Sequence, residues 1–334
     1  MANATDNRFK ARRNSRRIRE LYLEGEHVSL ENLKMRDDII HEEKVQKYLS
    51  KDVTGYPTPV EFHITELTHV TNKTSLREIW DLEGFEKDWF SWWSLKINEA
   101  EIRAAEERFL ESSIPDRSKE EIAAQKPFLR DFTTSPAFIN DTSRYGNFRF
   151  TFPLTELMEA YKKQMCEDKE PVLRVYKTKL FKQEIEYVVL VHSPQFNEEF
   201  NTYPLLKSSP LASYEGNQII WRAQAICETH NYQLAIHGKT AVTNPVMYPY
   251  QYYVWDQLSL VFFINEDKVL TFPKRKLKAS LSCCEVDQNI NLSNGDNCSS
   301  INEAEKFLES FQDDDEKKDE KEENAFGEVK MEMD

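Results

Sequence analysis

Apolar residues recur at helical spacing in three segments of the first half of the chain. Residues 75–84 carry Leu76, Ile79, Trp80 and Leu82, and this spacing predicts an amphipathic helix. We expect Thr74 or Ser75 to cap its start and Gly84 to end it. The same reasoning predicts further helices over 97–113 and 154–165.

After residue 165 the pattern changes to short runs rich in β-branched and aromatic residues, which is typical of strands. These runs predict strands at 172–176, 185–191, 218–225 and 250–264. Two shorter pieces, 61–64 and 69–71, precede the first helix, and residues 27–60 are expected to form a leading helix and loop with a turn at Gly55-Tyr56-Pro57. Helices that come early and strands that come late favour an α+β fold over alternating βαβ units.

Charge divides the chain into a basic start, an acidic body and an acidic end. Seven basic residues stand against Asp6 and Glu20 in the first twenty positions, namely Arg8, Lys10, Arg12, Arg13, Arg16, Arg17 and Arg19. Residues 303–334 hold fourteen acids against five lysines, and the whole chain has a net charge of −14. We therefore expect a basic N-terminal tail (1–24), a folded domain (25–275) and a largely disordered acidic C-terminal tail (276–334).

These features restrict the class of protein. No run approaches the roughly 20 apolar residues that span a bilayer, and no secretory leader is recognisable, so we expect a cytoplasmic or nuclear protein without membrane contact. The acidic body argues against a nucleic-acid groove, which leaves only the basic N-terminus for such a contact. The five cysteines form no CxxC pair, and we expect no metal site. Neither GxGxxG, a P-loop nor GxSxG occurs.

Three short motifs carry the candidate chemistry. The first is His69-Val70-Thr71, which leads through the predicted helix to Gly84-Phe85. The second is the stretch 134–145, which contains Phe138, Ser143 and Tyr145. The third is Gln251-Tyr252-Tyr253-Val254-Trp255-Asp256-Gln257, at the start of the last long strand.

Together the motifs resemble those of the ADP-ribosyltransferase family, which includes the catalytic domain of poly(ADP-ribose) polymerases. The resemblance covers about residues 62–275, and the third motif is its most distinctive part. The chain as a whole is also similar to virus- or interferon-induced relatives of that family from bony fish. The resemblance implies a split sheet with helices, NAD as substrate, and a role in the antiviral innate response with an unknown protein acceptor or partner.

The same resemblance implies roles for individual residues. His69 and Thr71 would bind a ribose of NAD, with His63 as an alternative strand histidine. Phe138, Ser143 and Tyr145 would hold the nicotinamide, and Gln251 with Tyr145 would occupy the catalytic positions. Family members usually carry a glutamate where this chain has Gln251.

The presence of Gln251 in place of a glutamate determines which activities we expect. An amide still donates and accepts hydrogen bonds, so NAD binding is compatible with it. It supplies no negative charge to the oxocarbenium-like ribose, and losing one such group typically costs about 10²–10³ in rate. Slow mono-ADP-ribosyl transfer, binding without turnover and a purely scaffolding fold all remain open. Glu215 and Glu228 are alternative carboxylates, and a non-enzymatic signalling protein is the alternative function.

Overall fold

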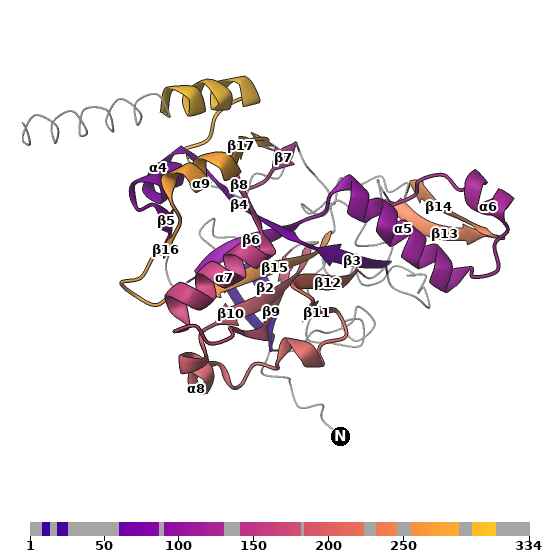
Figure 1. Cartoon of the computed structure of the whole chain (residues 1–334), viewed down its shortest axis with the longest axis horizontal. Helices are drawn as coiled ribbons and strands as arrows, with labels where there is room; N and C mark the ends of the chain where they lie inside the picture. The colour runs from indigo at the N-terminus through magenta and orange to yellow at the C-terminus, as the bar shows by residue number, and fades with distance from the viewer. Residues whose placement is uncertain are drawn as a thin grey trace, which may run out of the picture.

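A computed structural model describes residues 9–13, 19–25, 60–86, 90–129, 141–181, 184–223, 232–245, 255–286 and 296–311. The fold is mixed α and β, and it is organised around one large sheet (Figure 1). None of the described helices is long and apolar enough to cross a membrane.

The large sheet has nine strands in the order β1-β2-β9-β10-β15-β6-β4-β8-β17. Its strands are β1 (Phe9–Arg13), β2 (Arg19–Glu24), β9 (Val172–Phe181), β10 (Glu184–His192), β15 (Trp255–Phe263), β6 (Phe90–Lys96), β4 (Glu66–Thr71), β8 (Phe148–Pro153) and β17 (Leu281–Cys283). All neighbours pair antiparallel except β10 and β15, which run parallel. The sheet is therefore mixed, as expected for an α+β protein.

Smaller sheets and helices surround this core. A three-stranded sheet contains β11 (Ala212–Glu215), β12 (Gln218–Ala223) and β3 (Val60–Ile64), and a hairpin contains β13 (Tyr232–His237) and β14 (Thr240–Pro245). Two short pairs are β16 (Leu270–Thr271) with β5 (Gly84–Phe85), and β18 (Glu285–Val286) with β7 (Thr142–Ser143). The helices are α4 (Lys73–Asp81), α5 (Glu99–Ser113), α6 (Lys119–Ala124), α7 (Leu154–Met165), α8 (Asn197–Phe200), α9 (Lys274–Ser280) and residues 301–311. Figure 1 shows α5 and α6 lying beside the β13–β14 hairpin, away from the large sheet.

Alternating side chains give the large sheet two different faces. Leu258, Leu260 and Phe262 of β15 enter the main core, where Phe262 packs on Tyr161 of α7. Val261 and Phe263 point to the other face and form a smaller apolar cluster with Phe200 and neighbouring rings. A sheet with apolar side chains on both faces needs cover on both, and α7 and α8 supply part of it.

Several predicted elements are confirmed, and α4 corrects a detail. α7 spans the predicted 154–165, and α5 begins two residues after the predicted start. α4 begins earlier than predicted because Asn72 is its N-cap, with its side chain accepting the Ser75 N–H across 2.9 Å. Gly84 does not end the helix; it opens β5, where an added Cβ would lie 2.5 Å from the Leu270 carbonyl oxygen. The predicted leading helix and turn at 27–60 lie almost entirely outside the described residues.

Both segments that were expected to be tails contain described secondary structure. Residues 9–13 and 19–24 form β1 and β2 and extend the large sheet, because Leu23 is fully buried beside Thr178 of β9. At the other end, residues 301–311 form a helix that docks through two aromatic anchors: Phe307 packs on Phe148, and Phe311 packs on Trp80. The charge of these segments gave no indication of the strands or the helix, because a few apolar residues at the right spacing are sufficient to hold a short element in place.

Candidate functional site

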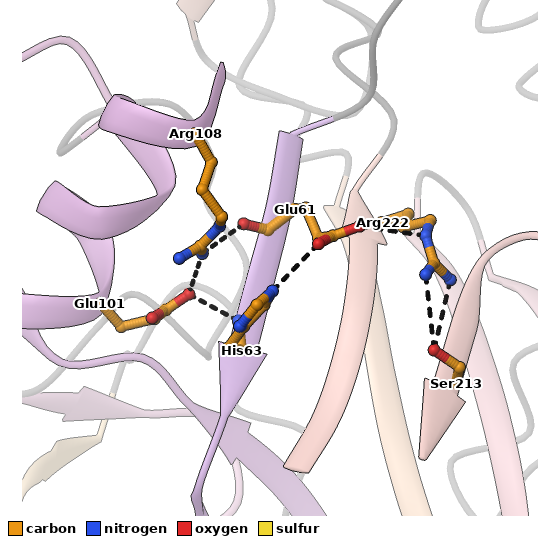
Figure 2. Close-up of polar contacts among 6 residues, drawn as sticks. All are labelled: Glu61, His63, Glu101, Arg108, Ser213 and Arg222. Atoms are coloured by element: carbon orange, nitrogen blue, oxygen red, sulfur yellow. Dashed lines mark hydrogen bonds and ion pairs between the residues drawn. The ribbon is translucent and has the colours of Figure 1, made fainter. Parts of the chain in front are cut away.

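The two candidate histidines lie in different sheets. His63 is on β3, where its backbone N–H donates to Glu101 of α5 across 2.5 Å and its Nε2 lies 2.9 Å from Glu61. Figure 2 shows that Glu61 also pairs with Arg222 of β12, at 3.2 Å. His63 therefore belongs to an ion-pair network that joins the three-stranded sheet to α5, whereas His69 lies on β4 of the large sheet.

This network is a structural link between elements. Arg108 of α5 donates to the Glu61 carbonyl across 2.8 Å and also pairs with Glu101. Burial raises the pKa of the Glu61 carboxyl, but the His63 hydrogen bond and the charges of Arg222 and Arg108 outweigh burial, so that the pKa lies below its ordinary value. The Glu61 carboxylate is thus held in its charged form by its neighbours.

His69 occupies the place where the large sheet divides. β4 and β6 pair only through Glu66–Lys96, Leu67–Leu95 and Thr68–Ser94, although both strands continue beyond Thr68 and Ser94. In this fork the His69 Nδ1–H donates to the Trp92 carbonyl oxygen of β6 across 2.8 Å. A side-chain hydrogen bond thus replaces a backbone bond that the diverging strands no longer make.

The imidazole of His69 packs in an aromatic environment. Its ring centroid lies 5.2 Å from that of Phe85 and 5.4 Å from that of Trp93. Both partners are almost fully buried, whereas His69 is half-buried. Since a carbonyl oxygen can only accept, the Nδ1 proton of His69 faces Trp92, and this bond fixes the orientation of the ring.

The end of the first motif lies against the described end of the second. Thr71 ends β4, and a Cβ placed on Gly146 would lie 2.0 Å from its carbonyl oxygen. Gly146 follows Tyr145, whose backbone N–H donates to the Ser143 hydroxyl across 3.1 Å. Only a glycine allows this close approach of the two backbones. Thr71 and the Ser143–Tyr145 turn, which we predicted to share a site, are therefore neighbours.

The third motif is described only from Trp255 onward. Gln251 of this motif and Phe138 of the second motif lie outside the described residues, so the structure places neither side chain. β15 begins at Trp255, and the β15 residue in line with Thr68 across the sheet is Ser259, through the pairs Thr68–Ser94 and Ser94–Ser259. Since direct cross-strand partners project from the same face, Ser259 shares the face of Thr68, whereas the His69 ring packs with Trp93 on the other.

A buried carboxylate next to Ser259 was missed by the sequence reasoning. Glu186 of β10 is only 8% exposed, and it accepts the Ser259 hydroxyl across 2.8 Å. The Lys179 ammonium lies 3.5 Å from the same carboxylate and 4.1 Å from the centre of the Trp92 ring. One acid inside the otherwise apolar run 185–191 was the signal that could have found it, because a buried charge is rare unless it is paired.

Of the two carboxylates that the sequence offered as substitutes, the described one, Glu215, does not take this position. Glu215 is exposed at the end of β11, where the chain turns into β12. Glu228 lies outside the described residues. Glu186 is therefore the described carboxylate that lies beside β15, on the face opposite to the His69 ring.

Comparison of the chain with protein-family models, with curated proteins and with solved structures gave no match.

Proposed function

We propose that the chain is an ADP-ribosyltransferase-like protein that binds NAD or ADP-ribose and transfers ADP-ribose slowly or not at all. The observation that carries this proposal is the position of His69 in the fork between β4 and β6, with its tautomer fixed by the Trp92 carbonyl. An imidazole oriented in this way is the group that we propose to contact a ribose hydroxyl.

The surroundings of the fork support the same proposal. Thr71 lies against Gly146, which brings the Ser143–Tyr145 turn to the end of β4. β15, which continues from the third motif, is separated from β4 by one strand, β6. We therefore propose that a dinucleotide lies across β4, β6 and β15, with His69 and Thr71 toward one ribose and Tyr145 toward the nicotinamide. When NAD is bound, it supplies the labile nicotinamide–ribose bond.

We expect slow turnover because Gln251 supplies no negative charge to the reacting ribose. Gln251 offers hydrogen bonds but no negative charge for the developing ribose cation, and a preorganised charge is worth about 10²–10³ in rate. The carboxyl group of Glu186 is already engaged by Ser259 and Lys179, on the face opposite to the His69 ring. We therefore propose binding as the main activity of the site.

The second candidate is a scaffold on which His69 is purely structural. The packing of its ring on Phe85 and Trp93 favours this reading, because aromatic neighbours of this kind also surround core histidines. The two candidates differ in one measurable property, which is whether the folded chain binds the ligand.

Isothermal titration of the full chain with NAD and with ADP-ribose tests the proposal. We expect His69→Ala to weaken binding at least about fivefold, since a hydrogen bond to a ligand is worth about 1 kcal/mol or more. His63→Ala is the matched control, because His63 belongs to the Glu61 network, and it should leave binding unchanged. Gln251→Glu should raise turnover in an NAD hydrolysis assay. If the folded wild-type chain gives no heat and no thermal shift with either ligand, the scaffold is the correct reading.

A further inference from the structure

The sheet edge formed by β1, β2 and β9 gathers cations and aromatic rings on one face. The register pairs Lys10 with Tyr22 and Tyr22 with Lys179, so these three side chains project from the same side of the sheet. Arg12 and Lys177 lie two residues from Lys10 and Lys179 on their own strands and share that side. The Lys179 ammonium reaches over Trp92 of β6. We call Lys10, Arg12, Tyr22, Lys177, Lys179 and Trp92 the cationic face.

Each ring of the cationic face lies against a cation. The Arg12 guanidinium is 5.5 Å from the centre of the Tyr22 ring, and the Lys177 ammonium approaches the same ring to 5.4 Å. The Lys179 ammonium lies 4.1 Å from the centre of the Trp92 ring. Tyr22 and Trp92 are both partly exposed, so solvent reaches the edge of each pair.

The cations lie close enough to disturb one another. Burial lowers the pKa of Lys177, and the charges of Arg12 and Lys179 lower it further, while Glu24 raises it. The acids on this face whose side chains are described are Glu24, 2.7 Å from Lys10, and Glu186, 3.5 Å from Lys179. Like charges that crowd together are relieved by a bound anion.

The cationic face is a basic surface on a chain that is acidic as a whole. The chain has a net charge of −14, yet the sequence from Arg8 to Arg19 is its most basic stretch. β1 and β2 fix part of that stretch to the sheet, next to the two lysines of β9. Lysines on an edge strand also discourage pairing with another strand, but that role does not account for rings interleaved with the cations.

We propose that the cationic face binds single-stranded nucleic acid, with RNA as the test case. Such strands are held by a row of basic side chains along the phosphates and by aromatic rings on which bases stack. The cationic face supplies both, with Lys10, Arg12, Lys177 and Lys179 for phosphates and Tyr22 and Trp92 for bases. This inference rests on a surface other than the His69 fork and is independent of NAD binding.

Charge complementarity alone would also suit an acidic peptide, including the chain's own residues 312–334. The aromatic rings decide between these occupants, because a carboxylate chain gains nothing from stacking, whereas each stacked base is worth about 1–3 kcal/mol. We therefore assign the face to a strand of nucleotides.

Fluorescence anisotropy of the full chain with a labelled oligouridylate of about twelve nucleotides tests this assignment. If about four phosphates are neutralised, log Kd should rise with log salt with a slope of about 3. Lys177→Gln together with Lys179→Gln should lower the slope by about 1.4 and weaken binding about tenfold or more. The matched control is the double variant Lys119→Gln and Arg103→Gln, at exposed positions of α6 and α5. It should change neither the salt slope nor the affinity.

A second pair of variants separates stacking from charge. Tyr22→Leu should weaken binding at least about fivefold with the salt slope unchanged, and Tyr22→Phe should bind like wild type. Thermal unfolding of each variant verifies that the fold is intact. The assignment is overturned if the oligouridylate does not bind, if Tyr22→Leu binds as wild type does, or if a heparin oligosaccharide of equal charge binds as tightly as the RNA.

Discussion

Arg174 donates its Nε–H to Nε2 of His192 across 2.9 Å, in the interior of the β9–β10 pair. The acceptor role of Nε2 requires a neutral ring, and the other nitrogen, Nδ1, donates to the Ser193 carbonyl across 2.8 Å. The guanidinium also donates to the Tyr203 carbonyl and to the Asn197 side chain. A neutral histidine thus helps to hold a buried cation that contacts Asn197 at the start of α8 and Tyr203 after its end.

This relationship predicts a loss of stability in acid. Burial and the charge of Arg174 lower the pKa of His192 below the ordinary 6.5. The unfolded chain therefore takes up a proton at a higher pH than the folded chain, so stability falls as pH drops below about 6.5 and continues to fall toward the lowered pKa. Thermal unfolding measured between pH 7.5 and 5 should show this decline.

Two variants separate His192 from the other titrating groups. His192→Ala leaves the Arg174 Nε–H without its acceptor and should cost about 2–3 kcal/mol at pH 7.5. It should also reduce the dependence on pH between 6.5 and 5. His237→Ala, at an exposed position of β13, is the control and should alter neither. An unchanged pH profile in His192→Ala would contradict the assigned tautomer.

We expect the helix of residues 301–311 to stabilise α4, which follows the strand that carries His69. Lys73, in the first turn of α4, lies 3.3 Å from Glu303 and 3.6 Å from Asp296, and its backbone N–H donates to the Asp296 carbonyl. Hydrogen bonds from Ser299 and Lys73 lower the pKa of Glu303 to about 2. Its contribution is therefore present above the ordinary pKa of 4.5 and is lost as pH falls from 4.5 toward about 2.

Amide hydrogen exchange measures this docking directly. Glu303→Gln should increase exchange in residues 301–311 and in α4, and Phe307→Ala should do so more strongly, since its ring packs on Phe148. Glu309→Gln, an exposed change on the same helix, is the matched control. Equal exchange in all three variants would show that the helix does not depend on these contacts.

We expect the replacement of Gly146, which lies against the end of β4, to be strongly destabilising. An added Cβ would lie 2.0 Å from the Thr71 carbonyl oxygen, and the φ of 159° is one that other residues rarely adopt. Gly146→Ala should therefore cost about 3 kcal/mol or more, through strain and displacement of β4. Gly238→Ala, with a φ of 61° and open space around it, should cost only about 1 kcal/mol. Urea unfolding of both variants compares these costs, and similar midpoints would contradict the close approach.

The sequence predicts best those elements whose apolar pattern is local. The period of 154–165 is sufficient to define α7, and the β-branched run 185–191 falls within β10. β6 was missed because its pattern is hidden by two adjacent tryptophans. Trp93 is buried in the main core, whereas Trp92 projects to the other face beneath Lys179. Adjacent aromatics suggest a cluster, but on a strand they separate to opposite faces.

The site depends on relationships that no local pattern contains. The sequence singled out His69 and Thr71, but only the pairing of β4 with β6 reveals that His69 lies where the strands diverge. Glu186 and Ser259 are 73 positions apart and meet because β10 and β15 run parallel. Parallel pairing of distant strands leaves no signal at short range, so the buried carboxylate was not predicted.

The pair formed by Glu186 and Lys179 should contribute measurable coupling. Both side chains are mostly buried, and Ser259 supplies a further hydrogen bond that orients the carboxylate. Pairs of this kind exceed the weak exposed ones, and we expect a coupling energy of about 1–2 kcal/mol. A double-mutant cycle of Glu186→Gln and Lys179→Met, measured by chemical unfolding, gives this quantity.

A separate comparison tests the pairing of β10 with β15, which brings Ser259 to Glu186. Glu186→Gln retains an acceptor for the Ser259 hydroxyl, so it should cost less than Ser259→Val, which leaves the carboxylate with one hydrogen bond fewer in a buried position. The exposed pair Lys169 and Glu167, at 3.2 Å, is the control cycle and should couple by well under about 1 kcal/mol. If the two cycles give equal coupling, Glu186 is solvated in solution, and the sheet face that carries it is more open than the structure indicates.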